Sequence, residues 1–214
     1  MQQNVDVYWS FRSPYSYLAV PQLRQLKDDL GVAVTIRPVY PLAVRDVSFF
    51  TNRRPQTLPY MMLDMVREAA RLNAPFRWPM PDPIVQDTDT LDVAKEQPRI
   101  DRLMRLGAIA QNEKGAAAFS FFEEVSAIIW NGQTDNWHEG DHLAEAAARA
   151  GFDLAAMEKT AAEEDAMLQK LIEENEAEQQ KYHWGVPLMV LNGEGFFGQD
   201  RMPALRWRLE TLKN

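Results

Sequence analysis

Hydrophobic and polar positions follow two different periods over the first forty residues. Val5–Trp9 is short, β-branched and aromatic, which predicts a strand. After Ser13 the pattern becomes helical and continues to Leu30, where Gly31 supplies a C-terminal stop. Val32–Tyr40 is apolar and β-branched again and predicts a second strand. Two strands joined through a helix lie parallel, with a right-handed crossover between them.

Two prolines modify these elements. Pro21 falls inside the helical pattern, where its missing N–H is expected to kink or break the helix. Pro38 marks the end of the second strand or places that strand at an edge of the sheet, because proline has no N–H to donate to a neighbouring strand.

Helical periodicity dominates from about Pro41 to Gln180. Two sets of apolar residues recur at helical spacing, which predicts a buried stripe on each of two helices. The stripes are Leu58, Met61, Met62, Met65, Val66 and Ala69, and Ala118, Phe121, Phe122, Val125, Ile128 and Ile129. The methionines are interpreted as ordinary core, because Met fills irregular gaps. Further helices are expected over residues 101–111, 142–150 and 153–180, and a proline-rich loop over residues 73–83.

Strand patterns return near the C-terminus. Residues 186–198 contain two apolar runs around Asn192-Gly193, which predicts a β-hairpin. A terminal helix follows, with Asp200 near its start and Pro203 in its first turn. The predicted order is βαβ, a helical insertion, then ββα. The fold class is therefore α/β, and the insertion is expected to pack against the split α/β unit.

Composition narrows the possible partners. A chain of 214 residues that is 46% hydrophobic can bury a full core, and its formal net charge of −8 opposes binding to nucleic acid. It contains no run of eighteen apolar residues and no signal-peptide pattern at its start, so we expect a cytoplasmic protein without a membrane partner. It also contains no cysteine, which excludes disulfides, thiolate metal sites and a thiol nucleophile of its own.

Three motifs together resemble one family. "SFRSPYSYLAVPQL", "WGVPLMV" and "FFGQDRMPAL" are similar to segments of the kappa-class glutathione transferases and the related 2-hydroxychromene-2-carboxylate isomerases. The resemblance implies a thioredoxin-like domain, residues 1–42 and 181–214, that is interrupted by an all-helical domain, residues 43–180. It also implies glutathione as cofactor, a homodimer, and contact between Ser13 and the glutathione thiol. Ser13 stands where thiol–disulfide oxidoreductases have the first cysteine of C-x-x-C.

The physical chemistry of Ser13 suits such a role. Pro14 favours the first helical position, which makes Ser13 the N-cap beside unpaired backbone donors. An anion is stabilised there, as low-pKa cysteines at helix N-termini demonstrate. A hydrogen bond from the hydroxyl to a thiolate would contribute about 1.5–3 kcal/mol, or one to two pKa units. Plain helix capping remains an alternative, and the two roles are compatible.

Other residues are assigned by the same resemblance. It implies that Pro187 is cis and that the backbone of Val186 pairs with the cysteinyl unit of glutathione; a trans proline that begins a strand is the alternative. Gln199 and Asp200 match a segment that holds the γ-glutamyl end, although Gln replaces the usual small polar residue and Asp200 is equally a candidate N-cap. Asn52 matches an asparagine near glutathione or substrate.

A substrate pocket is less well defined. Phe11, Tyr15, Trp78 and Trp184 are candidates for its apolar wall, but burial as core explains these aromatic residues equally well. Arg53 or Arg54 would receive a substrate carboxylate, although loop arginines are more often simply solvated.

One motif is set aside. "HEGDH" matches the zinc pattern H-E-x-x-H, but Gly140 separates the histidines and Asp141 resembles a helix cap, so His138 and His142 should straddle a helix start. We therefore predict no metal site. No histidine and carboxylate accompany a serine in a convincing triad order.

The leading hypothesis is a glutathione-dependent isomerase of an unsaturated aromatic carboxylate, with Ser13 stabilising the thiolate. A kappa-like transferase that conjugates electrophiles is the first alternative. A binding module that kept the fold and lost catalysis is the second.

Overall fold

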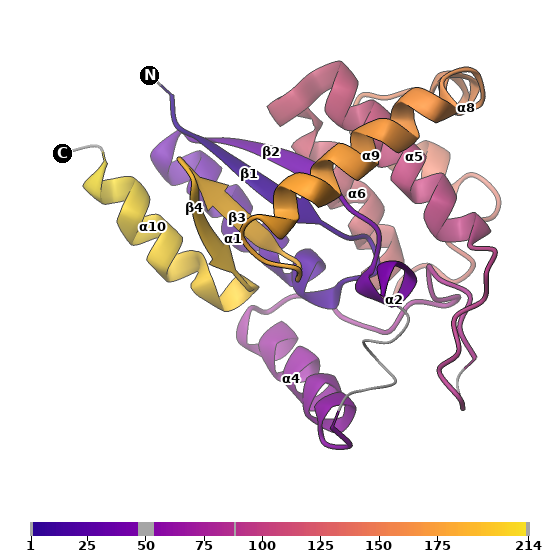
Figure 1. Cartoon of the computed structure of the whole chain (residues 1–214), viewed down its shortest axis with the longest axis horizontal. Helices are drawn as coiled ribbons and strands as arrows, with labels where there is room; N and C mark the ends of the chain where they lie inside the picture. The colour runs from indigo at the N-terminus through magenta and orange to yellow at the C-terminus, as the bar shows by residue number, and fades with distance from the viewer. Residues whose placement is uncertain (1, 47–53, 88, 213–214) are drawn as a thin grey trace.

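The computed structural model describes residues 2–46, 54–87 and 89–212. Its central sheet contains β1 (Asn4–Trp9), β2 (Ala33–Pro38), β3 (Leu188–Leu191) and β4 (Glu194–Phe197) in the order β2-β1-β3-β4 (Figure 1). β1 and β2 are parallel, as the sequence predicted, while β3 pairs antiparallel with both β1 and β4. The hairpin turn has Asn192 at φ 50° and Gly193 at φ 83°, which suits the right-handed twist of the strands.

Helix α1 (Pro14–Leu30) connects the two parallel strands. It begins with Ser13 as N-cap and ends at Gly31, whose φ of 62° is the left-handed conformation that glycine adopts without strain. The predicted break at Pro21 is wrong, because α1 continues through it. Pro21 lies on the exposed side, where water can satisfy the carbonyl it leaves free, while Leu23 and Leu26 hold the buried side.

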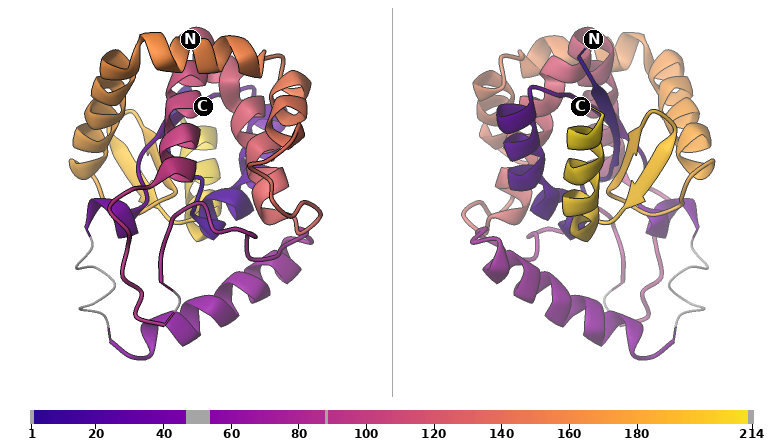
Figure 2. Two further views of the ribbon diagram at one scale, coloured as in Figure 1. Left: turned by 90° about the vertical axis from the view of Figure 1, so that its right-hand side faces the viewer. Right: turned by 90° about the vertical axis from the view of Figure 1, so that its left-hand side faces the viewer.

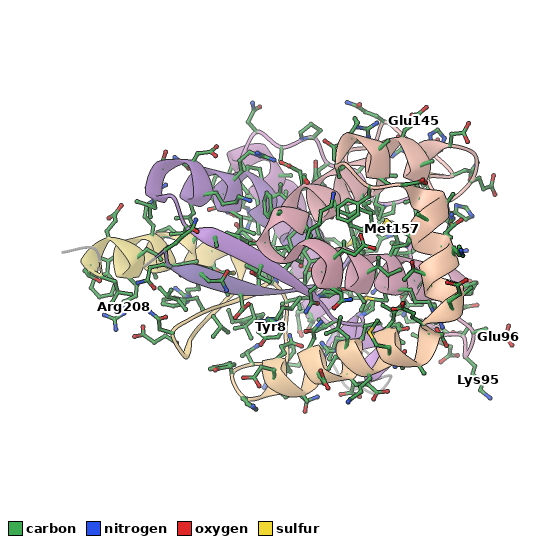
Figure 3. The ribbon with its side chains drawn as sticks, turned by 90° about the horizontal axis from the view of Figure 1, so that it is seen from above. Tyr8, Lys95, Glu96, Glu145, Met157 and Arg208 are labelled. Carbon is green, nitrogen blue, oxygen red and sulfur yellow. The ribbon has the colours of Figure 1, made fainter. Side chains whose placement is uncertain are left out.

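The sheet is covered on both faces. Val5 and Val7 point into the main core together with residues of α1 and α10 (Met202–Thr211). On the opposite face, α9 (Asp165–Gln180) lies beside the sheet, and Tyr8 is directed into the space between them (Figure 3). Because successive side chains of a strand point to opposite faces, β1 contributes to one layer of packing with α1 and α10 and to another with α9.

Most of the remaining helices come from the middle of the chain: α2 (Leu42–Arg45), α4 (Thr57–Arg71), α5 (Pro98–Lys114), η1 (Gly115–Ala118), α6 (Phe119–Trp130), α7 (His142–Arg149) and α8 (Leu154–Glu163). The short helix η2 (Gln199–Arg201) follows β4. One apolar core includes strand residues such as Val7 and helical residues such as Leu103 and Phe122. The insertion thus packs against the α/β unit. The exact boundaries at residues 43 and 180 stay a prediction.

Two helical predictions need correction. The single helix expected over residues 153–180 is two helices, because the chain turns at Glu164 (φ −119°, ψ 23°) so that α9 can pack on the sheet (Figure 3). The stripe of residues 118–129 is buried as expected, but the stripe of residues 58–69 is not. On α4 only Met65 and Ala69 are buried, whereas Met62 is 47% exposed and Val66 60%.

The position of α4 explains this exposure. It crosses the outside of the molecule beyond the end of the sheet (Figure 2), so only one narrow side meets other residues. Amphipathic spacing predicted the helix correctly, but the spacing does not determine whether another element covers the apolar side. Across the described ranges, no helix combines the length and apolarity needed to span a bilayer.

Candidate functional site

The register of the sheet brings three distant segments to one end. Tyr8 near the end of β1 pairs with Leu188 at the start of β3, and Leu188 pairs with Phe197 at the end of β4. Three segments therefore lie at the same end of the sheet. They are the loop after β1 that leads to Ser13, the Val186–Pro187 dipeptide before β3, and the Gln199–Arg201 turn after β4. These are the segments that carry the family motifs.

Ser13 occupies the N-cap position that the sequence predicted. Its Oγ accepts a hydrogen bond from the Ser16 N–H at 3.2 Å, and its carbonyl accepts the Tyr17 N–H at 3.2 Å. The Ser13 hydroxyl donates to no other residue of the described chain, and the Tyr15 N–H has no acceptor there. The Ser13 hydroxyl proton and the Tyr15 N–H are therefore both available to donate hydrogen bonds to an anion at the start of α1.

Val186 and Pro187 are joined by a cis peptide bond, as the resemblance implied. The Pro187 carbonyl accepts a hydrogen bond from the Gly198 N–H at 2.9 Å, which ties this turn to the end of β4. The N–H and carbonyl of Val186 form no hydrogen bond within the described residues. This main-chain unit is therefore open to pairing with an extended ligand.

Gln199 and Asp200 behave differently from each other. Gln199 is 3% exposed, and its amide accepts from Gln22 Nε2 at 3.0 Å and donates to Glu68 Oε2 at 2.7 Å. Its side chain is thus occupied in joining α1 to α4. Asp200 is exposed and does not cap α10, whose N-cap is Arg201. The Asp200 carboxylate lies 3.9 Å from Arg201 Nε in an exposed ion pair, which water and a ligand ammonium group can also reach.

Helix α4 is held against this end of the sheet by polar contacts. Besides the Glu68–Gln199 bond, Tyr15 donates its hydroxyl to Asp64 Oδ2 at 2.8 Å. Burial, reinforced by the hydrogen bond to Asp64, raises the pKa of Tyr15. The hydrogen bond from Arg71, together with that from Gln199, holds the pKa of Glu68 below its ordinary value. The sequence offered no signal for these contacts.

The four aromatic pocket candidates are not gathered into one wall. Phe11 is fully buried and stacks on Phe122 with 5.5 Å between ring centroids, so its assignment to a pocket is wrong. Its ring follows β1 into the core because Gly107 leaves room for it. Trp78 packs edge-on against the buried Trp130 and is half-buried. Tyr15 is half-buried and Trp184 is 49% exposed, so these two retain accessible surface near Ser13 and Val186 respectively.

Sequence reasoning missed Arg12, which immediately precedes Ser13. Its guanidinium donates to both oxygens of Asp82, at 3.0 and 3.1 Å, and to Gln86 at 2.8 Å. It also lies 5.8 Å from the centre of the Trp78 ring. The Ser13 loop is thereby fastened to the proline-rich segment, through partners about seventy residues away in the chain.

The remaining candidates are residues 52–54 and the two histidines of the HEGDH motif. Asn52 and Arg53 lie outside the described residues, and Arg54 is exposed. Gly140 has φ 55° and α7 begins at His142, so His138 and His142 straddle a helix start as expected. Within residues 2–46, 54–87 and 89–212, no three metal-binding side chains are grouped to hold an ion.

Comparisons with known proteins agree with this fold. The model of the DSBA-like thioredoxin domain family matches residues 4–210. Among solved structures, a 2-hydroxychromene-2-carboxylate isomerase has a TM-score of 0.69 and 24% identity, with 98% of this chain and 95% of that chain covered. A probable DsbA oxidoreductase from Streptomyces coelicolor has a TM-score of 0.68 and 15% identity, with coverage of 98% and 89%.

A third similar structure is the cytosolic disulfide reductase DsbM from Pseudomonas aeruginosa with GSH, at a TM-score of 0.55, 16% identity and 98% coverage of both chains. At these identities the likeness shows the fold. No curated protein matches the chain. The thioredoxin-like α/β fold with a helical insertion is thereby confirmed, and the chain belongs to the DSBA-like thioredoxin domain family.

Proposed function

We propose that this protein is a glutathione-dependent isomerase of the 2-hydroxychromene-2-carboxylate isomerase type. The observation that carries the proposal is the meeting of Ser13, the open Val186 main chain and Asp200 at one end of a sheet in a chain without cysteine. Thiol–disulfide exchange by the protein's own thiols is chemically impossible. Any sulfur chemistry at this position needs a thiol supplied by a ligand.

The donors and acceptors present fit glutathione. The Val186 main chain would pair with the cysteinyl unit, and the exposed Asp200 carboxylate would pair with the α-ammonium of the γ-glutamyl end. The Ser13 hydroxyl would donate to the sulfur while its oxygen still caps α1. The disulfide reductase with GSH among the similar structures supports a glutathione site in this fold, and the isomerase supports the reaction class.

When bound, glutathione would supply a thiolate that adds reversibly to a conjugated double bond and leaves after the bond has rotated. The protein's part is to keep that sulfur negative and oriented. The Ser13 hydroxyl, the free Tyr15 N–H and the positive end of α1 all favour the charged form. The accessible parts of Tyr15 and Trp184 would border an aromatic substrate.

Titration with glutathione tests the proposal directly. We expect calorimetry to show binding at millimolar concentration or below. A mixture with a trace of glutathione should then convert an unsaturated aromatic carboxylate between its isomers for many turnovers. Consumption of one glutathione per product would instead identify a transferase, which uses the same thiolate to attack an electrophile. Absence of binding at millimolar glutathione would refute both enzymes and leave a binding module.

A further inference from the structure

Val186 lies between two peptide groups that are firmly held. Before it, the Gly185 N–H donates to His183 Nδ1 at 2.9 Å, and the Gly185 carbonyl accepts from Gln179 Nε2 at 2.7 Å. After it, the Pro187 carbonyl is paired with Gly198. Side chains therefore satisfy both main-chain polar groups of Gly185, the residue that leads into the open Val186 main chain.

Buried contacts orient the Gln179 amide. Gln179 projects from α9 and is fully buried, and its Oε1 accepts from Arg45 Nη1 at 3.0 Å. Because one end of the amide is fixed by a cation, the other end must present its N–H₂ to Gly185. Arg45 also donates from Nη2 to the Trp184 carbonyl at 3.2 Å. Two helices, α2 and α9, thus act on one short loop.

The imidazole of His183 is held from the other side. Its ring stacks on Phe197 of β4 with 3.7 Å between centroids and 18° between planes. A Cβ on Gly185 would overlap the Phe197 ring and lie 3.2 Å from His183 Nδ1. Glycine at residue 185 therefore leaves room for the Phe197 ring that stacks on the imidazole.

We propose that Gln179 and His183 are positioning residues that hold the Gly185 peptide and so present the Val186 main chain to the cysteinyl unit of glutathione. This inference rests on the proposed function but concerns residues that the family motifs leave without a role. His183 accepts the Gly185 N–H only while Nδ1 carries no proton. Acid therefore removes this hydrogen bond and weakens ligand pairing at Val186.

The surroundings keep His183 neutral at pH 7. Burial lowers the pKa of its imidazole, and β4 faces it with the apolar Phe197 ring. Among the described residues, Arg45 of α2 is a charged group that reaches this loop, through Gln179 and the Trp184 carbonyl. Its Nε lies 3.9 Å from Glu176 of α9, which accepts the Tyr40 N–H. Proton uptake by His183 is then the change expected to loosen Gly185 in acid.

Matched variants separate the hydrogen bonds from the packing. His183→Phe keeps an aromatic ring beside Phe197 but has no acceptor, whereas His183→Asn keeps an acceptor near the place of Nδ1 and does not titrate. Gln179→Leu removes the donor to Gly185, and Gln180→Leu makes the same change at an exposed neighbour. Binding is measured by calorimetry with S-methylglutathione, whose sulfur does not titrate, at pH 7.5 and pH 5.

We expect wild-type protein to bind more weakly at pH 5 than at pH 7.5, because proton uptake at Nδ1 removes the hydrogen bond to Gly185. His183→Phe should bind about tenfold more weakly than the wild type at pH 7.5 and lose little more at pH 5. Gln179→Leu should bind about tenfold more weakly at pH 7.5 and still weaken in acid, while Gln180→Leu should behave like the wild type. His183→Asn should bind within about threefold of wild type at pH 7.5 and change little at pH 5. Hydrogen exchange of the Gly185 amide, followed by NMR, should be slow in the wild type and fast in His183→Phe.

The outcomes distinguish this inference from the proposed function. Wild-type protein that binds neither glutathione nor S-methylglutathione refutes the proposed function. If the wild type binds and His183→Phe and Gln179→Leu bind equally well, only the positioning role is overturned. Equal protection of the Gly185 amide in wild type and His183→Phe would overturn it independently of any ligand.

Discussion

At the scale of single residues, Ser13 carries two tasks with different physical demands. As an N-cap it needs only an oxygen that accepts the Ser16 N–H. To stabilise a thiolate it also needs a hydroxyl proton to donate and no negative charge of its own. Substitutions that meet one demand and fail the other can separate these tasks.

Ser13→Ala and Ser13→Asp make this separation. Ser13→Ala should lower the free energy of unfolding by about 1 kcal/mol, because the cap is lost. It should also raise the pKa of the bound glutathione thiol by about one unit, with glutathione affinity changed less than about tenfold. Ser13→Asp keeps the capping oxygen, so stability should be retained within about 0.5 kcal/mol. The thiol pKa should nevertheless rise, because the carboxylate repels the thiolate.

Urea unfolding gives the stabilities, and ultraviolet titration of the thiolate gives the pKa. An unchanged thiol pKa in both variants would show that Ser13 only caps α1.

At the scale of elements, α4 differs from the other long helices in what holds it. Helix α6 is fixed by a row of buried apolar residues, while α4 buries little and depends on the Tyr15–Asp64 and Gln199–Glu68 contacts. Both contacts join α4 to the segments that flank the candidate site. Changes in charge should therefore affect α4 more than the rest of the fold.

Acid should release α4 first. The pKa of Glu68 is lowered in the folded protein, so its carboxylate contributes stability that is fully present above the unfolded value, about 4.3, and is lost as the pH falls through the folded value. Hydrogen exchange of α4 amides, corrected for intrinsic rates, should accelerate below about pH 4 before that of α6. In Glu68→Gln the exchange of α4 should be faster at pH 6 and nearly independent of acid. Equal acid sensitivity of wild type and variant would contradict this role.

The two apolar stripes should respond oppositely to substitution. Val66 on α4 is 60% exposed, so Val66→Lys should change the free energy of unfolding by no more than about 0.5 kcal/mol. Phe122 on α6 is fully buried against Trp9 and Phe11, so Phe122→Ala should cost about 3–5 kcal/mol. Urea unfolding of both variants checks the contrast. A large loss in Val66→Lys would mean that another surface covers α4 in solution.

At the scale of the whole molecule, one core joins the α/β unit to the helical insertion. Residues of β1, α1, α5 and α6 belong to the same apolar cluster. Neither part can lose its packing without exposing the other, which favours cooperative unfolding.

Calorimetry should accordingly show a single thermal transition, with calorimetric and van't Hoff enthalpies that agree. Phe122→Ala should move that one transition to lower temperature without splitting it. Two resolved transitions would instead show that the insertion unfolds as an independent domain.

The pattern of residues determined the local structure of this protein. Hydrophobic periodicity, capping residues and turn residues were sufficient to predict four features. They are β1, the start of α1 at Ser13-Pro14, the hairpin at Asn192-Gly193 and the buried side of α6. These features depend on neighbours within a few residues. The missing cysteine likewise excluded exchange chemistry by the protein's own thiols without any structure.

Only the tertiary structure decided which surfaces are covered and which distant groups meet. Spacing described α4 and α6 alike, but burial depends on what packs opposite each helix. Gln199 is hydrogen-bonded to Gln22, which lies 177 positions away in the chain. Arg12 is hydrogen-bonded to Asp82, which lies 70 positions away. The hydrogen bonds of Gly185 likewise depend on helix α9 returning to the sheet. Contacts between separate elements follow from how the chain packs as a whole, and no local pattern encodes them.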